Sequence, residues 1–248
     1  MEQELKPAEP QEERMGFFAR ISGIFFEPKK VFTFLNSKPS WLFAFLLVVL
    51  IGAVVAEITL PQSLLLQKEI VSQSPRLSSA PTGTLEKMTQ ITTAKRVVTF
   101  VSEIIRVFLF SLVLLTAVIY FLCNIILGGD SSFKKVLSVV TYTSLVPTLG
   151  AILKTPLILV KNSLDVQIGL ALLMPAGDFS KIRYMILSTL DIFSIWQIIL
   201  IAIGITVLYK FSMTKAFITT FVSWALLVFL GIGLSVLGMS ASGIPVSW

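Results

Sequence analysis

Five charged side chains stand inside or beside long apolar runs of the sequence, where an ionised group needs a polar neighbour. They are Glu57, Glu103, Arg106, Lys154 and Asp191. An ionised carboxylate within a bilayer is costly unless it is paired, so we expect Glu57 to have a basic partner, with Arg106 favoured over Lys154. Either these residues form structural pairs and reach interfacial water, or they line a polar vestibule that receives an ion, a lipid headgroup or a small solute.

Hydroxyl side chains are frequent in the apolar run at 136–153. Ser138, Thr141, Ser144 and Thr148 are candidates for the lining of a solute path, because hydroxyls can replace part of a hydration shell. Equally, each can donate back to the carbonyl four residues earlier, or bond across to a neighbouring helix. The sequence leaves both interpretations open.

Residue sets for catalysis or for a cofactor are missing from the sequence. There is no His, and the single Cys123 lies in an apolar run, which removes disulfides, His or Cys metal sites and His-dependent triads. No Gly-rich phosphate loop and no pair of carboxylates at hydrolase spacing is present. We therefore expect a protein that is not an enzyme, with no catalytic residue, no metal and no cofactor.

The composition is that of a membrane protein. Of 248 residues, 55% are hydrophobic and only 14% are charged, against about 25% charged in average soluble domains. The net charge of +6 comes from basic residues that mostly flank apolar blocks, which indicates membrane anchoring and not nucleic-acid binding. The expected partners are membrane lipid and, beyond it, other membrane proteins or a second copy of the chain.

The apolar blocks predict an all-α integral membrane protein with five transmembrane helices, because each can cross about 30 Å of hydrocarbon. The predicted spans are 41–60, 107–127, 136–153, 192–209 and 216–238. Pro61 is expected to end the first span, and Lys154 with Pro156 to end the third. The segment that follows the first span is expected to have its loop tip at 72–84, and a re-entrant or interfacial segment is expected at 157–175. Because no Pro or Gly occurs between Leu85 and Leu127, the second span is expected to be the end of one unbroken helix capped by Thr84.

The regions outside the spans complete the domain plan. Residues 1–13 are expected to be a disordered tail, residues 14–40 to form cytoplasmic amphipathic helices, and residues 239–248 to be a short tail. The amphipathic helices can lie in the headgroup plane or pack on the spans. Lys and Arg near span ends place the N-terminus in the cytoplasm and the C-terminus outside, in the inner (cytoplasmic) cell membrane. This topology puts the five charged residues at one depth on the outer side.

Short motifs in a fixed order resemble the Yip1 domain family (Ypt-interacting proteins), specifically its bacterial and archaeal members. They are Phe-Phe-Glu-Pro-Lys-Lys-Val-Phe at 25–32, Pro-Ser-Trp at 39–41, Leu-Asp-Ile-Phe-Ser-Ile-Trp at 190–196, Ile201 to Gly204, the turn Lys210 to Ala216, and Trp224. The resemblance implies five spans and a cytoplasmic N-terminus. Eukaryotic relatives act in vesicle trafficking and associate with Rab-type GTPases and with each other; their Asp-Leu-Tyr-Gly-Pro signature is absent here.

Two functions follow as hypotheses. The favoured one is a non-enzymatic scaffold or adaptor that organises the membrane, because the cytoplasmic ends of the spans at 42–48, 120–127 and 205–208 hold no charged residue for a path. The alternative is a small channel or transporter with a polar outer vestibule. A continuous polar path to both faces would favour the transporter.

Overall fold

The regular secondary structure of the chain is helical. The computed structural model describes residues 15–72, 83, 87, 90–166, 168–174, 181–244 and 246–247, so the expected tail at 1–13 lies outside the described residues. The helices are α1 (Phe17–Phe26), α2 (Pro28–Ser37), α3 (Leu42–Ile58), α4 (Leu60–Ser72), α6 (Thr93–Ile105), η2 (Arg106–Leu114), α7 (Leu115–Tyr120), η3 (Phe121–Ile126), α8 (Phe133–Thr143), α9 (Leu145–Lys161), η4 (Leu170–Leu173), α10 (Ile182–Ser188), α11 (Ile192–Tyr209) and α12 (Met213–Ala241).

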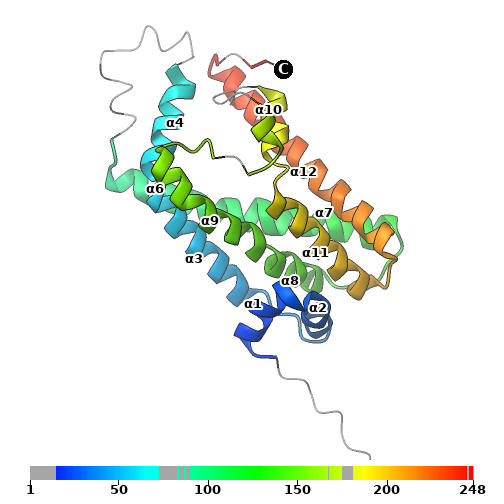
Figure 1. Ribbon diagram of the computed structural model, residues 1–248. Coiled ribbons are helices and arrows are strands. Elements are labelled where there is room, and N and C mark those ends of the chain that lie inside the picture. The colour runs from blue at the N-terminus through cyan, green and yellow to red at the C-terminus, as the bar shows by residue number, and fades with distance from the viewer. Residues whose placement is uncertain are drawn as a thin grey trace, which may run out of the picture.

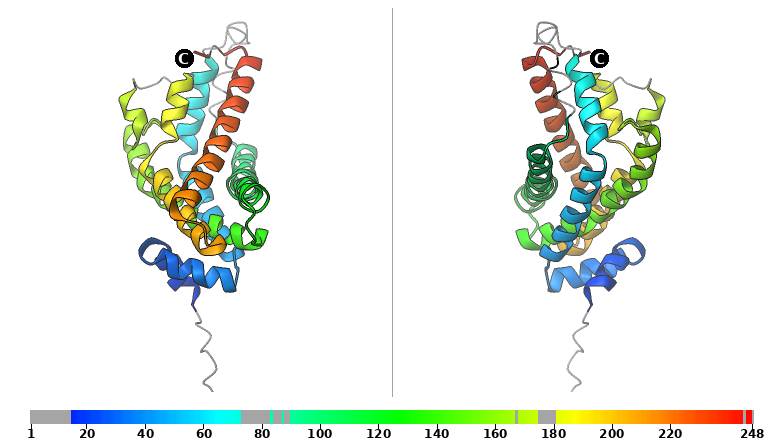
Figure 2. Two further views of the ribbon diagram at one scale, coloured as in Figure 1. Left: turned by 90° about the vertical axis from the view of Figure 1, so that its right-hand side faces the viewer. Right: turned by 90° about the vertical axis from the view of Figure 1, so that its left-hand side faces the viewer.

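Within the described residues, four helices are long and apolar enough to cross a membrane, and a bent pair raises the number to five. The four are Thr93–Ile126, Phe133–Lys161, Ile192–Tyr209 and Met213–Ala241. Figure 1 shows α3, α9, α11 and α12 running along one another, with the helix from α6 to α7 crossing them. In Figure 2 that crossing helix is seen almost along its axis while the others run from top to bottom. The protein is an all-α multi-pass membrane protein, as predicted.

The first span is the bent pair. Helix α3 ends at Ile58, and α4 continues at an angle of 66° as far as Ser72. The prediction that Pro61 ends the helix is therefore wrong. Pro61 does not stop the helix, because it stands in the first turn of α4, where a missing N–H costs nothing.

The long helix from Thr93 to Ile126 is unbroken between Lys95 and Arg106, as predicted, but it does not begin at Leu85. Residues 90–92 are not helical, and Thr92 caps the start by accepting from the N–H of Lys95. The backbone is α-helical to Ile105, π-helical from Arg106 to Leu114 and again from Phe121 to Ile126. The predicted cap, Thr84, lies outside the described residues.

Helix α6 crosses α3 (Figure 2), and the contacts between the long helix and α3 run in opposite sequence order. Phe45 meets Phe108 edge-on, with ring centroids 5.5 Å apart, and Gly52 faces Glu103 further along. The polar residues Arg96 and Glu103 of α6 face α3, whereas Val97, Val98, Phe100 and Val101 are exposed.

The third span is longer than predicted. Helices α8 and α9 meet at Ser144 and form one span that passes through Pro156 and ends at Lys161. Pro156 removes only its own N–H bond, and the neighbouring turns hold the helix together. Asn162 then turns the chain with φ of 49°. Residues 157–161 are thus the end of α9. In the rest of the segment predicted as re-entrant or interfacial, the described residues contain one turn of 3₁₀ helix, at Leu170–Leu173, and no longer helix.

The centre of the bundle lies around α8 and α11. Every residue from Val136 to Thr143 is buried. Opposite them, α11 buries Ile201, Ala202 and Ile205. Close approach of the two helices depends on Gly204, whose hydrogen faces the side chain of Val139.

The N-terminal hairpin of α1 and α2 packs on the protein's own spans. Ile24, Val31, Phe32 and Leu35 are fully buried, whereas Phe18 and Phe26 are each 83% exposed. Figure 2 shows the hairpin at the opposite end of the bundle from the end of α12. Of the two arrangements expected for residues 14–40, the structure has the packed one.

Arg20 fastens this hairpin to α8. Its guanidinium donates to the Ser40 hydroxyl and lies 5.4 Å from the ring centroid of Phe34 and 5.8 Å from that of Tyr142. We expect Arg20→Gln to weaken docking by about 1–2 kcal/mol, the worth of a partly desolvated cation–π contact. Amide hydrogen exchange in α1 and α2 should then accelerate about 5- to 30-fold. The exposed Lys29→Gln serves as the control; equal exchange in both variants would show that Arg20 does not hold the hairpin.

Candidate functional site

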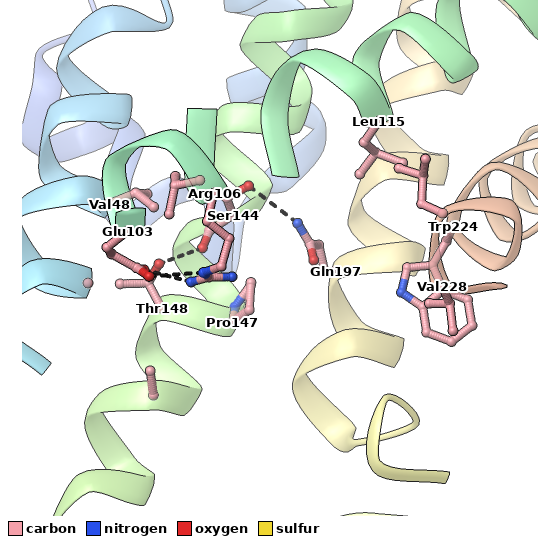
Figure 3. A pocket seen from close by; sticks show the side chains of 14 residues that line it. Val48, Glu103, Arg106, Leu115, Ser144, Pro147, Thr148, Gln197, Trp224 and Val228 are labelled. Carbon is pink, nitrogen blue, oxygen red and sulfur yellow. Dashed lines mark hydrogen bonds and ion pairs between the residues drawn. The ribbon is translucent and has the colours of Figure 1, made fainter. Parts of the chain in front are cut away.

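A cavity of about 360 Å³ lies inside the helical bundle and brings residues from every long helix together. Its lining residues are Val48 and Gly52 of α3; Glu103 of α6; Arg106 and Val107 of η2; Leu115 of α7; Ser144, Pro147, Thr148 and Ala151 at the α8–α9 joint; Gln197 of α11; and Trp224, Leu227 and Val228 of α12. In Figure 3 the charged pair and Thr148 lie at one side, Leu115, Trp224 and Val228 at the other, and Gln197 between them.

Glu103 and Arg106 form a two-point ion pair at the cavity wall. Arg106 Nε donates to Glu103 Oε2 at 2.9 Å and Nη2 donates to Oε1 at 2.6 Å. The Glu103 side chain is 15% exposed and that of Arg106 is 62% exposed. The carboxylate fits because α3 presents Gly52 to it: a Cβ there would stand 3.0 Å from Glu103 Oε1.

Two of the four candidate path hydroxyls reach this cavity, and two do not. Ser144 and Thr148 line it, whereas Ser138 and Thr141 are fully buried elsewhere in the packed core. All four donate to the carbonyl four residues earlier, at 2.7–2.8 Å. These hydrogen bonds to their own helix backbone match the interpretation in which the hydroxyls do not line a solute path.

Gln197 and Trp224 are site residues that the sequence interpretation missed. Gln197 Nε2 donates weakly to Ser144 Oγ, at 3.4 Å. An amide within an otherwise apolar span was the available signal, because a polar side chain in a membrane helix usually faces the bundle interior. Trp224 was noted only as part of a motif.

Glu57 has a basic partner, but the partner is Arg96 and not Arg106 or Lys154. Arg96 Nη1 donates to Glu57 Oε1. The order of the contacts between α3 and the long helix explains the error: with Phe45 beside Phe108 and Gly52 beside Glu103, the end of α3 meets Arg96. Our prediction counted the second span only from residue 107, so it aligned the wrong turn with Glu57.

The remaining two candidates form a third, separate pair. Lys154 Nζ donates to Asp191 Oδ2 at 2.5 Å, and Asp191 Oδ1 accepts from the N–H of Ser194 at 2.8 Å. Burial alone would raise the pKa of the Asp191 carboxyl, but the bonds from Lys154 and Ser194 and the charge of Lys154 hold the pKa below its usual value. The five candidates and Arg96 therefore form three pairs, of which only Glu103 with Arg106 lines the cavity.

The donor set of the cavity suits polar contact and not metal binding. Across the described ranges, no three His, Cys, Asp or Glu side chains stand close enough together to hold a metal ion. What the cavity offers is one carboxylate, one guanidinium, two hydroxyls and one amide on an otherwise apolar wall.

The Glu57–Arg96 pair should matter little for stability. Their side chains are 44% and 56% exposed, and exposed pairs contribute about 0–1 kcal/mol. We expect Arg96→Gln to lower the thermal midpoint in detergent by no more than about 4 °C, on the scale of about 2–4 °C per kcal/mol. A loss of about 3 kcal/mol or more, typical of a broken buried pair, would contradict the low contribution expected for this exposed pair.

Comparison with known proteins agrees with the helical membrane architecture. The Yip1 domain family model matches residues 22–234. "Membrane protein YknW" of Bacillus subtilis (strain 168) is 31% identical over 113 residues, which are 44% of this chain and 47% of that protein. The alignment thus spans about half the length of this curated relative, and no solved structure shows a significant match. Since the family model covers most of the chain, from before α2 into α12, this protein belongs to the Yip1 domain family.

Proposed function

We propose that the protein is a non-enzymatic scaffold or adaptor of the cell membrane whose helix α12 binds a partner helix. The observation that carries this proposal is the lack of buried residues in the part of α12 from residue 224 onward. The helix has 29 residues, yet those it buries, Ala216, Thr219, Thr220 and Ser223, all lie near its start. From 224 to 241 no residue is buried.

The same part of α12 has a surface that suits close helix packing. A Cβ added at Gly231, Gly233 or Gly238 would meet no atom of the protein within 4 Å. In a bilayer, helices associate through small residues that let backbones approach, since lipid tails give no hydrophobic drive. The proposed occupant is a transmembrane helix, supplied by another membrane protein or by a second copy of this chain.

The alternative, a channel or transporter, draws support from the polar cavity. A path from that cavity towards the 128–132 and 210–212 turns would have to pass the packed core of α8 and α11. That core is apolar and buried at Val136, Val140, Ile201 and Ile205, and the hydroxyls of Ser138 and Thr141 are engaged with backbone. The arrangement therefore favours the scaffold.

Site-specific photo-cross-linking in native membranes tests the proposal. A photoreactive residue at Leu234, which is 51% exposed, should give a discrete protein adduct that disappears when Gly231 and Gly233 are both changed to Leu. Leu50 on α3, 61% exposed, is the matched control and should give lipid adducts. Lipid adducts alone at Leu234, or solute flux through protein-containing liposomes above that of empty ones, would contradict the scaffold role.

We also propose that the N-terminus is cytoplasmic and the C-terminus lies outside, in the inner (cytoplasmic) cell membrane. Basic residues crowd the 128–135 and 210–215 segments, as the positive-inside rule expects of cytoplasmic turns. In a Cys123→Ala background, a cysteine at Ser242 should react with an impermeant thiol reagent on intact cells, and one at Asp130 should not. The reverse pattern would invert the topology.

A further inference from the structure

We propose that the bundle cavity holds the headgroup of a zwitterionic phospholipid, with its phosphate on Arg106 and its ammonium on Glu103 and Thr148. No assigned role of the protein includes such a site, and the proposal does not depend on what α12 binds. The argument rests on the depth of the ion pair, its unused hydrogen-bonding capacity and its net charge.

The ion pair stands near the middle of the bundle. Its neighbours Ser144, Gln197 and Trp224 each lie 11–12 residues from the helix end that adjoins the 128–132 or the 210–212 turn. At 1.5 Å per residue this is about 16–18 Å. Since half of a hydrocarbon core of about 30 Å is about 15 Å, these residues lie near the depth of the bilayer midplane if the turns lie at its surface. Yet 62% of the Arg106 side chain is exposed, so the guanidinium would face hydrocarbon unless a polar group fills the cavity beside it.

The groups around the cavity retain unused hydrogen-bonding capacity. Glu103 engages Nε and Nη2 of Arg106, and no described residue accepts from Nη1. Thr148 donates to the Ser144 carbonyl, which leaves its oxygen able to accept from an ammonium. The Gln197 amide, held only by the 3.4 Å bond to Ser144, can turn to donate to a phosphate oxygen. Guanidinium and phosphate match in geometry and charge.

Charge and shape select the kind of headgroup. Glu103 and Arg106 together are neutral, so the site balances a headgroup that carries one phosphate and one ammonium better than one with a net negative charge. A volume of about 360 Å³ is at the lower end of small-molecule sites, about 300–1,000 Å³, and holds a headgroup but not two acyl chains. Trp224, Leu227 and Val228 offer the apolar wall along which the chains would leave, and a Trp ring suits such a polar–apolar boundary.

Native mass spectrometry of the purified full-length protein in detergent tests the site. Titration with phosphatidylethanolamine should give one saturable bound lipid, whereas phosphatidylglycerol should bind at least about tenfold more weakly. Soluble glycerophosphoethanolamine and inorganic phosphate should not bind at the same concentrations, which separates a lipid from a free phosphate. Equal binding of the two lipids, or binding of either soluble probe as tight as that of the lipid, would overturn the proposal.

Variants locate the bound lipid. Arg106→Gln should weaken phosphatidylethanolamine binding on the order of tenfold or more, the effect of losing one charged hydrogen-bonding partner. Thr148→Val and Gln197→Leu leave the ion pair intact, so each should weaken phosphatidylethanolamine binding less than Arg106→Gln does. These two variants still test the site if Arg106→Gln does not fold. Arg96→Gln, at the Glu57 pair outside the cavity, is the control and should bind as the parent does. Unchanged binding in all cavity variants would place the lipid elsewhere and refute the site.

Discussion

Asp191→Ala should destabilise the protein by about 2–4 kcal/mol, because it removes two interactions at once. The carboxylate pairs with Lys154 and caps α11 by accepting from the N–H of Ser194. Loss of a cap costs about 0.5–2 kcal/mol and breaking a fully buried pair about 3–5 kcal/mol. The side chains of Lys154 and Asp191 are 25% and 12% exposed, so the pair is not fully buried and contributes less than the fully buried figure.

Conservative variants separate the two losses. Asp191→Asn keeps an oxygen for the cap and removes the charge, so it should cost less than Asp191→Ala. Lys154→Met combined with Asp191→Asn should be less destabilising than the sum of the single changes, because neither partner is left unpaired. Chemical unfolding of the four variants in detergent measures the coupling. Strictly additive losses would show that the two charges do not interact.

The pH dependence of the same pair has a defined sign. Since the pKa of Asp191 is lowered in the folded protein, its stabilisation is present above the unfolded value of about 3.9 and is lost as the pH falls through the lower, folded pKa. The difference in stability between the parent and Asp191→Asn should therefore shrink on acidification below about pH 4. A difference that grew in acid would contradict the lowered pKa.

Gly204→Ala should be the second large effect, with a loss of about 1–3 kcal/mol from overpacking. A Cβ at this position would overlap the Val139 side chain, which is itself fully buried in α8. The two helices would have to move apart at the centre of the bundle. Thermal unfolding in detergent should show a lowered midpoint.

Gly233→Ala is the matched control, because Gly233 also lies within a span but a Cβ there meets no atom within 4 Å. Helix propensity favours Ala over Gly by about 1 kcal/mol, so this variant should be neutral or more stable as a monomer. Equal destabilisation by both changes would mean that the loss at Gly204 does not come from contact with Val139.

Element boundaries were predictable where local chemistry sets them. The fourth span was predicted as 192–209, the bounds of α11, because Asp191 caps its start and Lys210, with φ of 55°, ends it beside a basic turn. The two prolines misled for different reasons. Pro61 stands in the first turn of α4, where its missing N–H costs little, whereas Pro156 stands inside α9, where the neighbouring turns hold the helix together.

The candidate site was predictable in its residue types but not in its pairing. Charges in apolar runs correctly pointed to ion pairs, yet Glu57 was assigned to Arg106. The hydropathy pattern placed the second span at 107–127, the uncharged half of the long helix, and so left Arg96 out of consideration. The register of α3 against α6 depends on contacts such as Phe45 with Phe108, which are tertiary and leave no trace in the hydropathy pattern. Gln197 was passed over because one amide hardly changes the mean hydropathy of α11.

The π-helical stretch between Arg106 and Leu114 has a consequence for how the length of this helix can vary. A π turn holds one residue more than an α turn, so deleting one residue there can leave the backbone helical and fully hydrogen-bonded. Because the wide turn absorbs the extra residue, the turns on either side keep their register when that residue is removed. Leu115, Ile119 and Cys123, all buried in the bundle, would still face it. A one-residue deletion within the π-helical stretch should therefore be tolerated, whereas the same deletion within α6 would turn the helix after it by about 100°.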